Sequence, residues 1–395
     1  MAKTERLYYT DCYLREFEAQ VLRIEPAEKG TRVYLDRTAF YPDSGGQPSD
    51  LGTLDGIPVR GVVDEGEVVA HVLERAPGQE RVKGSIDWLR RFDHMQQHTG
   101  QHVLSAAFEK TGNYKTVSFH LGSTESSIDL DSDRLGRRQI EEAEGLANEV
   151  IFEDRPVRIF FQPADAAREM DLRKPTFREG DVRLVEVEGF DLSACGGTHL
   201  RSTGAIGLVC VRKFERMKGL TRVEFVCGRR ALRAGRGDFQ TLTEAARLFS
   251  AALENVPGLI TKQSEELRAA LRAQEKLIER LAQYRATELV QSAPEKAGRK
   301  IVRIILESEE ALEAKKLAYA VVKQPAAVAL IGVKGKPATL YFSQSPGAAT
   351  DLGKILKQAL AQVGGKGGGA KDFAQGGGID ESRLEETLSA AESLL

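Results

Sequence analysis

Residues 93–110, DHMQQHTGQHVLSAAFEK, combine a helical apolar pattern with three histidines spaced four residues apart. Val103, Leu104 and Phe108 continue one apolar face, which predicts a helix through this stretch. Side chains four residues apart on a helix lie about 6 Å from each other, within reach of one metal ion. We therefore predict that His94 and His98 are a pair of metal ligands.

His102 also follows His98 by four residues. It lies about 12 Å along the helix axis from His94, so it can share an ion with His98 only. We interpret His102 as a packing residue or as an outer partner of the site.

A second pair of metal ligands stands in Cys195-Gly-Gly-Thr-His199, where two glycines are typical of a tight turn. Three imidazoles and a thiolate suit zinc, which favours nitrogen and sulfur donors. The sequence therefore predicts a Zn²⁺ site formed by His94, His98, Cys195 and His199. A zincin protease is excluded, because its general-base glutamate would follow the first histidine, where this chain has Met95.

The composition is that of a folded protein of two or three domains, with 395 residues of which 41% are hydrophobic. We see no apolar run long enough to span a bilayer, and the first twenty residues lack the apolar core of a secretory signal. The four cysteines, at positions 12, 195, 210 and 227, are scattered rather than arranged as a disulfide framework. We therefore expect a cytoplasmic protein with no membrane partner.

The expected fold is a multidomain α+β chain. Short β-like runs broken by Gly, Pro and Asp predict a small N-terminal β-barrel over residues 1–88. Residues 89–238 mix helices and strands in an α+β domain that holds the metal site, and 297–395 read as a small α/β domain.

Residues 239–296 predict a helical linker, which Pro257-Gly258 would break in two. An apolar stripe runs along it, so a helical hairpin and a short coiled-coil seam of a homodimer both remain open; its members are Ile260, Leu267, Leu271, Ile278 and Leu281.

The net charge of −2 does not by itself indicate a nucleic-acid partner, but residues 212–236 carry nine basic residues against Glu215 and Glu224. Such a density can follow a phosphate backbone, although a solvated face is the ordinary alternative. We predict RNA contacts from Arg212, Lys213, Arg222, Arg229 and Arg230.

A glycine-rich segment, GGKGGGAKDFAQGGG, occupies residues 364–378. The backbone amides of such a loop can cradle an anion, to which Lys366 and Lys371 add charge. A flexible linker is the alternative. The segment is not a P-loop, because Ser or Thr does not follow its Gly-Lys.

Residues 36–50, DRTAFYPDSGGQPSD, offer a further binding element. Gly45 and Gly46 allow a close approach of backbone to a ligand, while Thr38 and Gln47 supply uncharged hydrogen bonds. An ordinary strand followed by a turn would explain this segment equally well.

Taken together, FYPDSGGQPSD, HMQQH, CGGTHL, TRVEFVCGRRAL and KDFAQGGG resemble the alanyl-tRNA editing proteins of the AlaX type, in their long form. The resemblance runs from about Tyr8 to the C-terminus, where the chain is similar to the domain found beside DHH phosphoesterases. It implies an aminoacyl-tRNA hydrolase that deacylates mischarged tRNA(Ala), chiefly Ser-tRNA(Ala) and secondarily Gly-tRNA(Ala). Because we see no preceding aminoacylation domain, we expect editing in trans.

The resemblance also assigns residues. It implies that His94, His98, Cys195 and His199 hold zinc and that Thr38 recognises the serine hydroxyl. The acyl pocket would be lined by Gly45, Gly46, Gln47 and Gln97. The partner would be the acceptor end of tRNA(Ala), with the elbow as a further contact.

The chemistry agrees with that function. An apolar pocket rejects an added hydroxyl only by a factor of about 10², so a second, hydrolytic site is needed. Zinc can polarise an ester carbonyl or acidify water, and we assign no catalytic group beyond a zinc-bound water. Four protein ligands would close the tetrahedron, which leaves three possibilities: one ligand stays off, the ion becomes five-coordinate, or it only positions the tRNA end.

Two other classes of protein are alternatives. A non-catalytic tRNA-binding module would use the zinc as a structural ion. A DHH-type phosphoesterase would need an Asp-His-His run, whereas here Asp93-His94 is followed by Met95.

Overall fold

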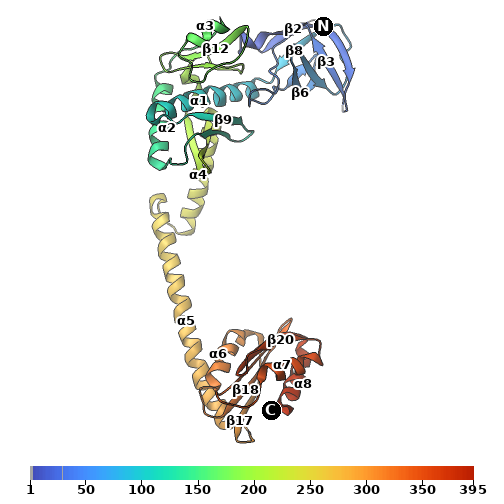
Figure 1. Ribbon diagram of the computed structural model, residues 1–395, viewed down its shortest axis with the longest axis vertical. Coiled ribbons are helices and arrows are strands. Elements are labelled where there is room, and N and C mark those ends of the chain that lie inside the picture. Colours follow the sequence, from blue (N-terminus) through green and yellow to red (C-terminus); the bar gives the residue numbers. More distant parts are fainter. Residues whose placement is uncertain (1–2, 29) are drawn as a thin grey trace. The chain divides into compact units, whose positions relative to one another are not determined.

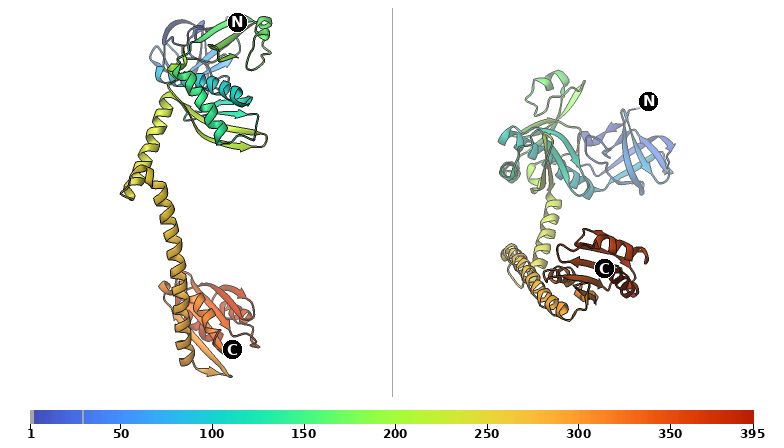
Figure 2. Two further views of the ribbon diagram at one scale, coloured as in Figure 1. Left: turned by 90° about the vertical axis from the view of Figure 1, so that its left-hand side faces the viewer. Right: turned by 60° about the horizontal axis from the view of Figure 1, so that its bottom comes forward.

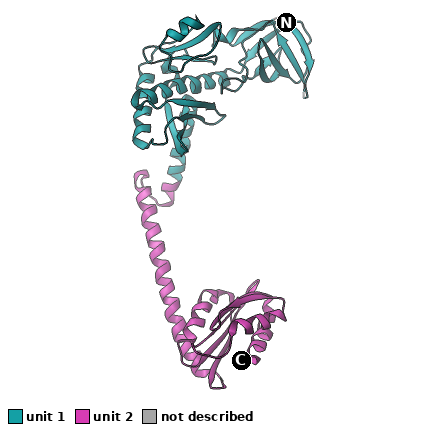
Figure 3. Ribbon diagram, in the orientation of Figure 1, with its two compact units in different colours: residues 1–244 teal, residues 245–395 magenta. Residues whose placement is uncertain are grey.

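The computed structural model describes residues 3–28 and 30–395, which form two compact units, Met1–Glu244 and Ala245–Leu395 (Figures 1 and 3). Both units combine helices and sheets, and the predicted multidomain α+β class is confirmed. In the part of the chain that is described, none of the helices has the length and apolar character needed to cross a membrane.

The N-terminal part of the first unit is a closed barrel of six strands. In spatial order these are β2 (Glu16–Pro26), β3 (Thr31–Leu35), β7 (Val68–Leu73), β6 (Ile57–Glu65), β5 (Gly52–Leu54) and β8 (Arg81–Ile86). Side chains alternate between the interior and solvent, as the first residues of β2 do. Two short strands, β1 (Glu5–Arg6) and β4 (Arg37–Thr38), pair in parallel outside the barrel order.

Helix α1 (Trp88–Gly112) follows the barrel directly. The Asp87 side chain caps its first turn by accepting from the Arg90 N–H, and Asn113 ends it in the left-handed region at φ 55°. The helix is buried from His94 to Phe108, packed against α2 (Arg137–Phe152) and the neighbouring sheets (Figure 2).

Two sheets complete the first unit. One has the order β14 (Val209–Met217), β15 (Leu220–Cys227), β10 (Ser126–Leu130), β9 (Thr116–Leu121). The other has the order β11 (Val157–Pro163), β12 (Asp181–Val187), β13 (Asp191–Ala194), with α3 (Ala164–Glu169) between its first two strands in the chain.

The helical stretch consists of α4 (Gly228–Leu248) and α5 (Val256–Ser292). The predicted break at Pro257-Gly258 is wrong, because Pro257 lies in the first turn of α5. Proline is tolerated there, since the N–H groups of a first turn have no partner within the helix. The interruption falls instead between the two helices, where Ser250 has a positive φ of 50° and a 3₁₀ turn, Leu253–Asn255, precedes α5.

The second unit contains a six-stranded sheet with helices on both faces. Its order is β16 (Glu295–Lys296), β17 (Arg299–Leu306), β18 (Ala327–Val333), β19 (Ala338–Gln344), β21 (Phe373–Ile379), β20 (Lys366–Gly369). One face packs on α7 (Leu352–Ala361) and α8 (Leu384–Ser393), the other on α6 (Ala311–Val321) and α5.

The glycine-rich segment is not the loop that the sequence predicts, because it forms the antiparallel pair β20 and β21. The glycines serve close packing. A Cβ on Gly376 would lie 2.5 Å from Leu360 Cδ1 of α7, and a Cβ on Gly367 would lie 2.7 Å from the Gly376 Cα. Lys366 and Lys371 are nevertheless exposed, as an anion contact would require.

Candidate metal centre

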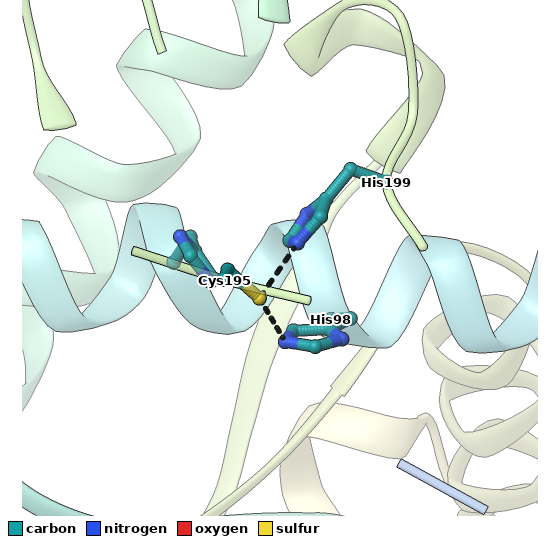
Figure 4. Close-up of side chains that lie close together, drawn as sticks. His98, Cys195 and His199 are labelled. Atoms are coloured by element: carbon teal, nitrogen blue, oxygen red, sulfur yellow. Dashed lines mark hydrogen bonds between the residues drawn. The ribbon is translucent and has the colours of Figure 1, made fainter. Parts of the chain in front are cut away.

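Four buried or half-buried side chains could hold a metal ion in the first unit: His98, His102, Cys195 and His199. One ligand atom from each lies within 4.8 Å of the others. Cys195 Sγ lies 3.4 Å from His98 Nε2 and 3.3 Å from His199 Nε2 (Figure 4). Three imidazoles and one thiol form a donor set that fits zinc, so the residues present suit the ion expected from the sequence.

The cluster forms where the turn after β13 meets the middle of α1. Gly197 packs against the His98 ring so closely that a Cβ there would lie 2.2 Å from His98 Cε1. Arg183 of β12 holds the turn by donating to the carbonyl oxygens of Cys195 and Gly197 at 2.7 and 2.9 Å. Glycine at position 197 therefore allows a contact that any side chain there would block.

Each imidazole has an outer partner on Nδ1. His98 Nδ1 lies 2.8 Å from Gln47 Oε1, and His199 Nδ1 lies 3.2 Å from Thr99 Oγ1. His102 Nδ1 lies 3.1 Å from Asp191 Oδ2. Such partners fix the orientation of a ligating ring and the nitrogen that it offers to the metal.

The surroundings of Cys195, His102 and His199 shift the pKa of each of them. Burial disfavours the thiolate of Cys195, but the neighbouring His98 and His199, with hydrogen bonds from His102 and His199, lower its pKa well below the usual value. Burial alone would lower the pKa of His102, but its hydrogen bond to Asp191 and the nearby Cys195 raise it to about 9. Burial lowers the pKa of His199 to about 3, so this ring is neutral.

The structure corrects the predicted ligand set, because His94 lies outside the cluster and His102 lies within it. His94 and His102 stand on either side of His98 along α1, and the turn after β13 approaches at the level of His98 and His102. His94 is buried, its Nδ1 has no hydrogen-bond partner among the described residues, and burial together with nearby arginines lowers its pKa to about 3.

Gln47 supports the cluster, whereas the sequence predicts that it lines the acyl pocket. Its side chain is fully buried, its Oε1 faces His98 Nδ1 and accepts from the Thr198 N–H, and its Nε2 donates to Thr198 Oγ1. Of the neighbouring glycines, Gly45 does line the cavities beside the cluster. Gly46 instead packs on β9, where its φ is +81° and a Cβ would lie 2.8 Å from the Phe119 carbonyl oxygen.

Thr38 and Gln97 lie away from the cavities beside the cluster. Thr38 is fully buried, with its Oγ1 2.8 Å from His71 Nε2 and accepting from the Phe40 N–H. Because His71 Nδ1 faces the Val33 carbonyl oxygen and burial lowers the His71 pKa to about 4, His71 is neutral and Thr38 donates to its Nε2. Gln97 bonds both backbone groups of Cys227 and so ties α1 to the end of β15.

Two cavities flank the cluster and share Gly45, His98, Ala194 and Cys195 in their walls. The first, of about 160 Å³, is lined further by residues from the barrel side, among them Arg6, Tyr9, Tyr41, Ser44 and Asp64. The second, of about 250 Å³, is lined further by His102, Phe119, Arg173 and Lys174.

Most of the basic residues predicted to contact RNA are paired with carboxylates. Arg212 pairs with Asp238, Lys213 with Glu215, Arg222 with Asp129, and Arg230 with Asp93. Arg230 is also buried and donates to the Gly122 carbonyl oxygen at 2.7 Å, so it joins α4 to other parts of the unit. Arg229 is exposed, as a phosphate contact requires.

Sequence reasoning missed the supporting residues Asp191, Thr99 and Arg183. Asp191 is fixed by Arg173 Nε at 2.6 Å and by Ser193 Oγ as well as by His102. Asp191 could have been found from the sequence, because it stands four residues before Cys195. A carboxylate commonly accepts a hydrogen bond from a metal-bound histidine.

Comparison with known proteins identifies two domains. Residues 182–224, which include the CGGTH turn, match the threonyl and alanyl tRNA synthetase second additional domain, and residues 289–395 match the DHHA1 domain. The chain is 30% identical over 407 residues to the alanyl-tRNA editing protein AlaX-L of Pyrococcus horikoshii, covering 98% of this chain and 97% of that protein.

The alanine–tRNA ligases of Pyrococcus abyssi and Halorubrum lacusprofundi are 32% and 34% identical over the whole of this chain. This chain spans only 44% of each ligase. Fold and site thus define a protein built from a synthetase-type additional domain and a DHHA1 domain. The chain belongs to the family of alanyl-tRNA editing proteins of the AlaX type, which confirms the resemblance.

Proposed function

We propose that this protein is a trans-editing hydrolase that cleaves the aminoacyl ester of mischarged tRNA(Ala) in the cytoplasm. Ser-tRNA(Ala) is the chief substrate and Gly-tRNA(Ala) a secondary one. The observation that carries the proposal is the cluster of His98, His102, Cys195 and His199, of which His98 and Cys195 line both cavities. The relationship to an alanyl-tRNA editing protein over nearly the whole chain supports the same substrate.

Zinc is the cofactor in this proposal. The three imidazoles and the thiolate of the cluster are donors that zinc prefers, and the lowered pKa of Cys195 favours its thiolate form. When bound, the ion would supply Lewis-acid polarisation of the ester carbonyl. Gln47, Thr99 and Asp191 hold the three imidazoles in orientation through their Nδ1 atoms.

The smaller cavity is the proposed site for the amino acid. Its volume of about 160 Å³ suits a small side chain, and its wall includes the polar side chains of Tyr9, Tyr41 and Ser44. A site that hydrogen-bonds a serine hydroxyl discriminates against alanine more strongly than an apolar pocket does, because alanine would leave its polar partner unpaired.

Recognition of the serine hydroxyl by Thr38 stays a prediction. In the structure the Thr38 hydroxyl donates to His71 in the barrel interior. Thr38→Val tests it. If Thr38 recognises the hydroxyl, the variant keeps its zinc and loses part of the preference for Ser-tRNA(Ala) over Ala-tRNA(Ala). An unchanged preference would assign recognition to the cavity wall.

Contacts to the body of the tRNA complete the proposal. Arg229, Lys366 and Lys371 are exposed and suited to phosphate, while Arg212, Lys213 and Arg222 would have to exchange a carboxylate partner for one. The tRNA elbow is a further proposed contact. A homodimer through the helical region or the C-terminal domain is also part of the proposal, and the exposed side chains of Ile260, Leu267 and Leu271 on α5 support the first of these.

The first experiment is hydrolysis of Ser-tRNA(Ala) and Ala-tRNA(Ala) by purified protein before and after zinc removal. We expect rapid loss of serine only from the zinc-loaded protein, and His98→Ala should lose both zinc and activity. Deacylation by zinc-depleted His98→Ala would contradict the metal mechanism. Inertness of the zinc-loaded protein on both substrates would favour the alternative, a tRNA-binding module with a structural zinc site.

A further inference from the structure

The connection between α3 and β12, residues 171–180, borders both cavities beside the metal centre. Lys174 lines the cavity of about 250 Å³ and Arg178 the cavity of about 160 Å³, while Cys195 lines both. Two cations only four positions apart in the chain thus line different cavities beside the same cluster.

The connection is held in place on either side of its tip. The Arg173 N–H donates to the Leu192 carbonyl oxygen at 2.9 Å, and Arg173 Nε donates to Asp191 at 2.6 Å. Further along, Thr176 is buried and its Oγ1 accepts from the Arg178 N–H at 3.3 Å. The arrangement is therefore anchored through the same carboxylate that supports His102.

Phe177 lies at this tip with 89% of its side chain exposed, more than any other large hydrophobic residue of the described chain. It adds nothing to a hydrophobic core, since exposure leaves its apolar surface in water. An exposed aromatic ring flanked by cations is the arrangement on which single-stranded nucleic acids stack their bases.

Lys174 and Arg178 are free to meet phosphate. Within residues 3–28 and 30–395, neither side chain forms an ion pair, whereas Arg222 and Arg230 of the predicted basic segment pair with Asp129 and Asp93. A cation that already has a carboxylate partner must give up that partner to bind phosphate. Among the described residues, Lys174 and Arg178 have no such partner to give up.

We propose that the 171–180 connection binds the single-stranded 3′ end of the tRNA. Phe177 stacks on one of its unpaired bases, and Lys174 and Arg178 meet phosphates as the strand passes between the two cavities. This inference rests on the proposed function and adds the element that positions the acceptor end at the cluster.

The test is binding of uncharged tRNA(Ala), intact or lacking its last three nucleotides, to the full-length protein, measured by fluorescence anisotropy. We expect Phe177→Ala to weaken binding of intact tRNA about 10- to 100-fold and to leave binding of the truncated tRNA unchanged. Phe177→Trp should retain the affinity for intact tRNA. The matched control is Phe152→Ala at the end of α2, which removes a ring that is 74% exposed and lines neither cavity.

The cations are tested by salt dependence. Replacing both Lys174 and Arg178 with alanine should lower the slope of log affinity against log salt by about 0.7 for each phosphate that the protein no longer neutralises. Arg138→Ala, an exposed arginine of α2, is the control and should leave the slope unchanged. The inference would be overturned if Phe177→Ala bound the intact tRNA, like the truncated one, with the same affinity as the unaltered protein. Failure to hydrolyse Ser-tRNA(Ala) would contradict the proposed function separately, because the binding assay needs no hydrolysis.

Discussion

The carboxylate of Asp191 lies 3.1 Å from Nδ1 of His102, one of the four side chains of the candidate metal centre. The carboxylate is itself fixed, since Arg173 and Ser193 bond its oxygens and the pKa of Asp191 is lowered although burial opposes ionisation. A fixed acceptor at Nδ1 leaves the other nitrogen of the ring for an ion.

Replacing Asp191 should therefore weaken metal binding without removing a ligand. We expect Asp191→Asn to lower zinc affinity about 10- to 100-fold, because the imidazole loses its anionic acceptor. Competition with a chromophoric chelator measures the affinity. Asp129→Asn, which breaks the pair with Arg222 outside the cluster, is the control, and equal zinc affinities in the two variants would argue against the assigned role of Asp191.

A matched pair of variants can show whether His94 or His102 joins His98 as a zinc ligand. His102→Ala should lose stoichiometric zinc, since one of the four donors disappears, whereas His94→Ala should retain it. Elemental analysis of the purified proteins measures zinc per chain. Loss of zinc from His94→Ala with retention in His102→Ala would restore the ligand set predicted from sequence.

Two buried glutamines have different partners and should behave differently. Gln47→Ala removes the acceptor at His98 Nδ1, so zinc affinity should fall by about 10- to 100-fold. Gln97→Ala removes bonds to the Cys227 backbone, which should lower the free energy of unfolding by about 1–3 kcal/mol and leave zinc affinity unchanged. Chelator competition and urea unfolding on both variants check this pair, and a zinc defect in Gln97→Ala would speak against it.

His71 should make the stability of the barrel depend on pH. Its folded pKa of about 4 lies below the ordinary value of 6.5, so the unfolded chain binds a proton first as pH falls. The stabilisation is complete above about pH 6.5 and is lost as pH falls through about 4, a change of about 3 kcal/mol. His71→Gln should lack this component.

Hydrogen-exchange mass spectrometry along a urea gradient, read on peptides of β6 and β7, measures the barrel alone. The difference between the unaltered protein and His71→Gln isolates this residue from other buried histidines such as His94. If the free energy of unfolding of the barrel depended on pH in the same way in both proteins, the prediction would be contradicted. His71 would then take up a proton in the folded barrel as readily as in the unfolded chain.

Much of the fold follows from local pattern. The apolar face of residues 93–110 predicts the helix that the structure has as α1, Trp88–Gly112. Glycine-rich strands carry no such pattern, because residues such as Gly367 and Gly376 have no side chain to alternate. β20 and β21 consequently read as a loop.

The sequence by itself determined that this protein carries a histidine pair on a helix and a Cys–His pair on a glycine turn, a donor set suited to zinc. Both signals are local, arising from helical periodicity and from the chemistry of the side chains. It could not decide between His94 and His102, because each lies four residues from His98 and either spacing places two rings on one helix face.

Only the tertiary structure decided which histidines gather with Cys195 and His199. The turn that bears Cys195 and His199 meets α1 beside His98 and His102. Gly197 packs against the His98 ring there, and Asp191 contacts His102. Contacts between segments about a hundred residues apart depend on how β13 packs on α1, and spacing along the chain does not encode that packing.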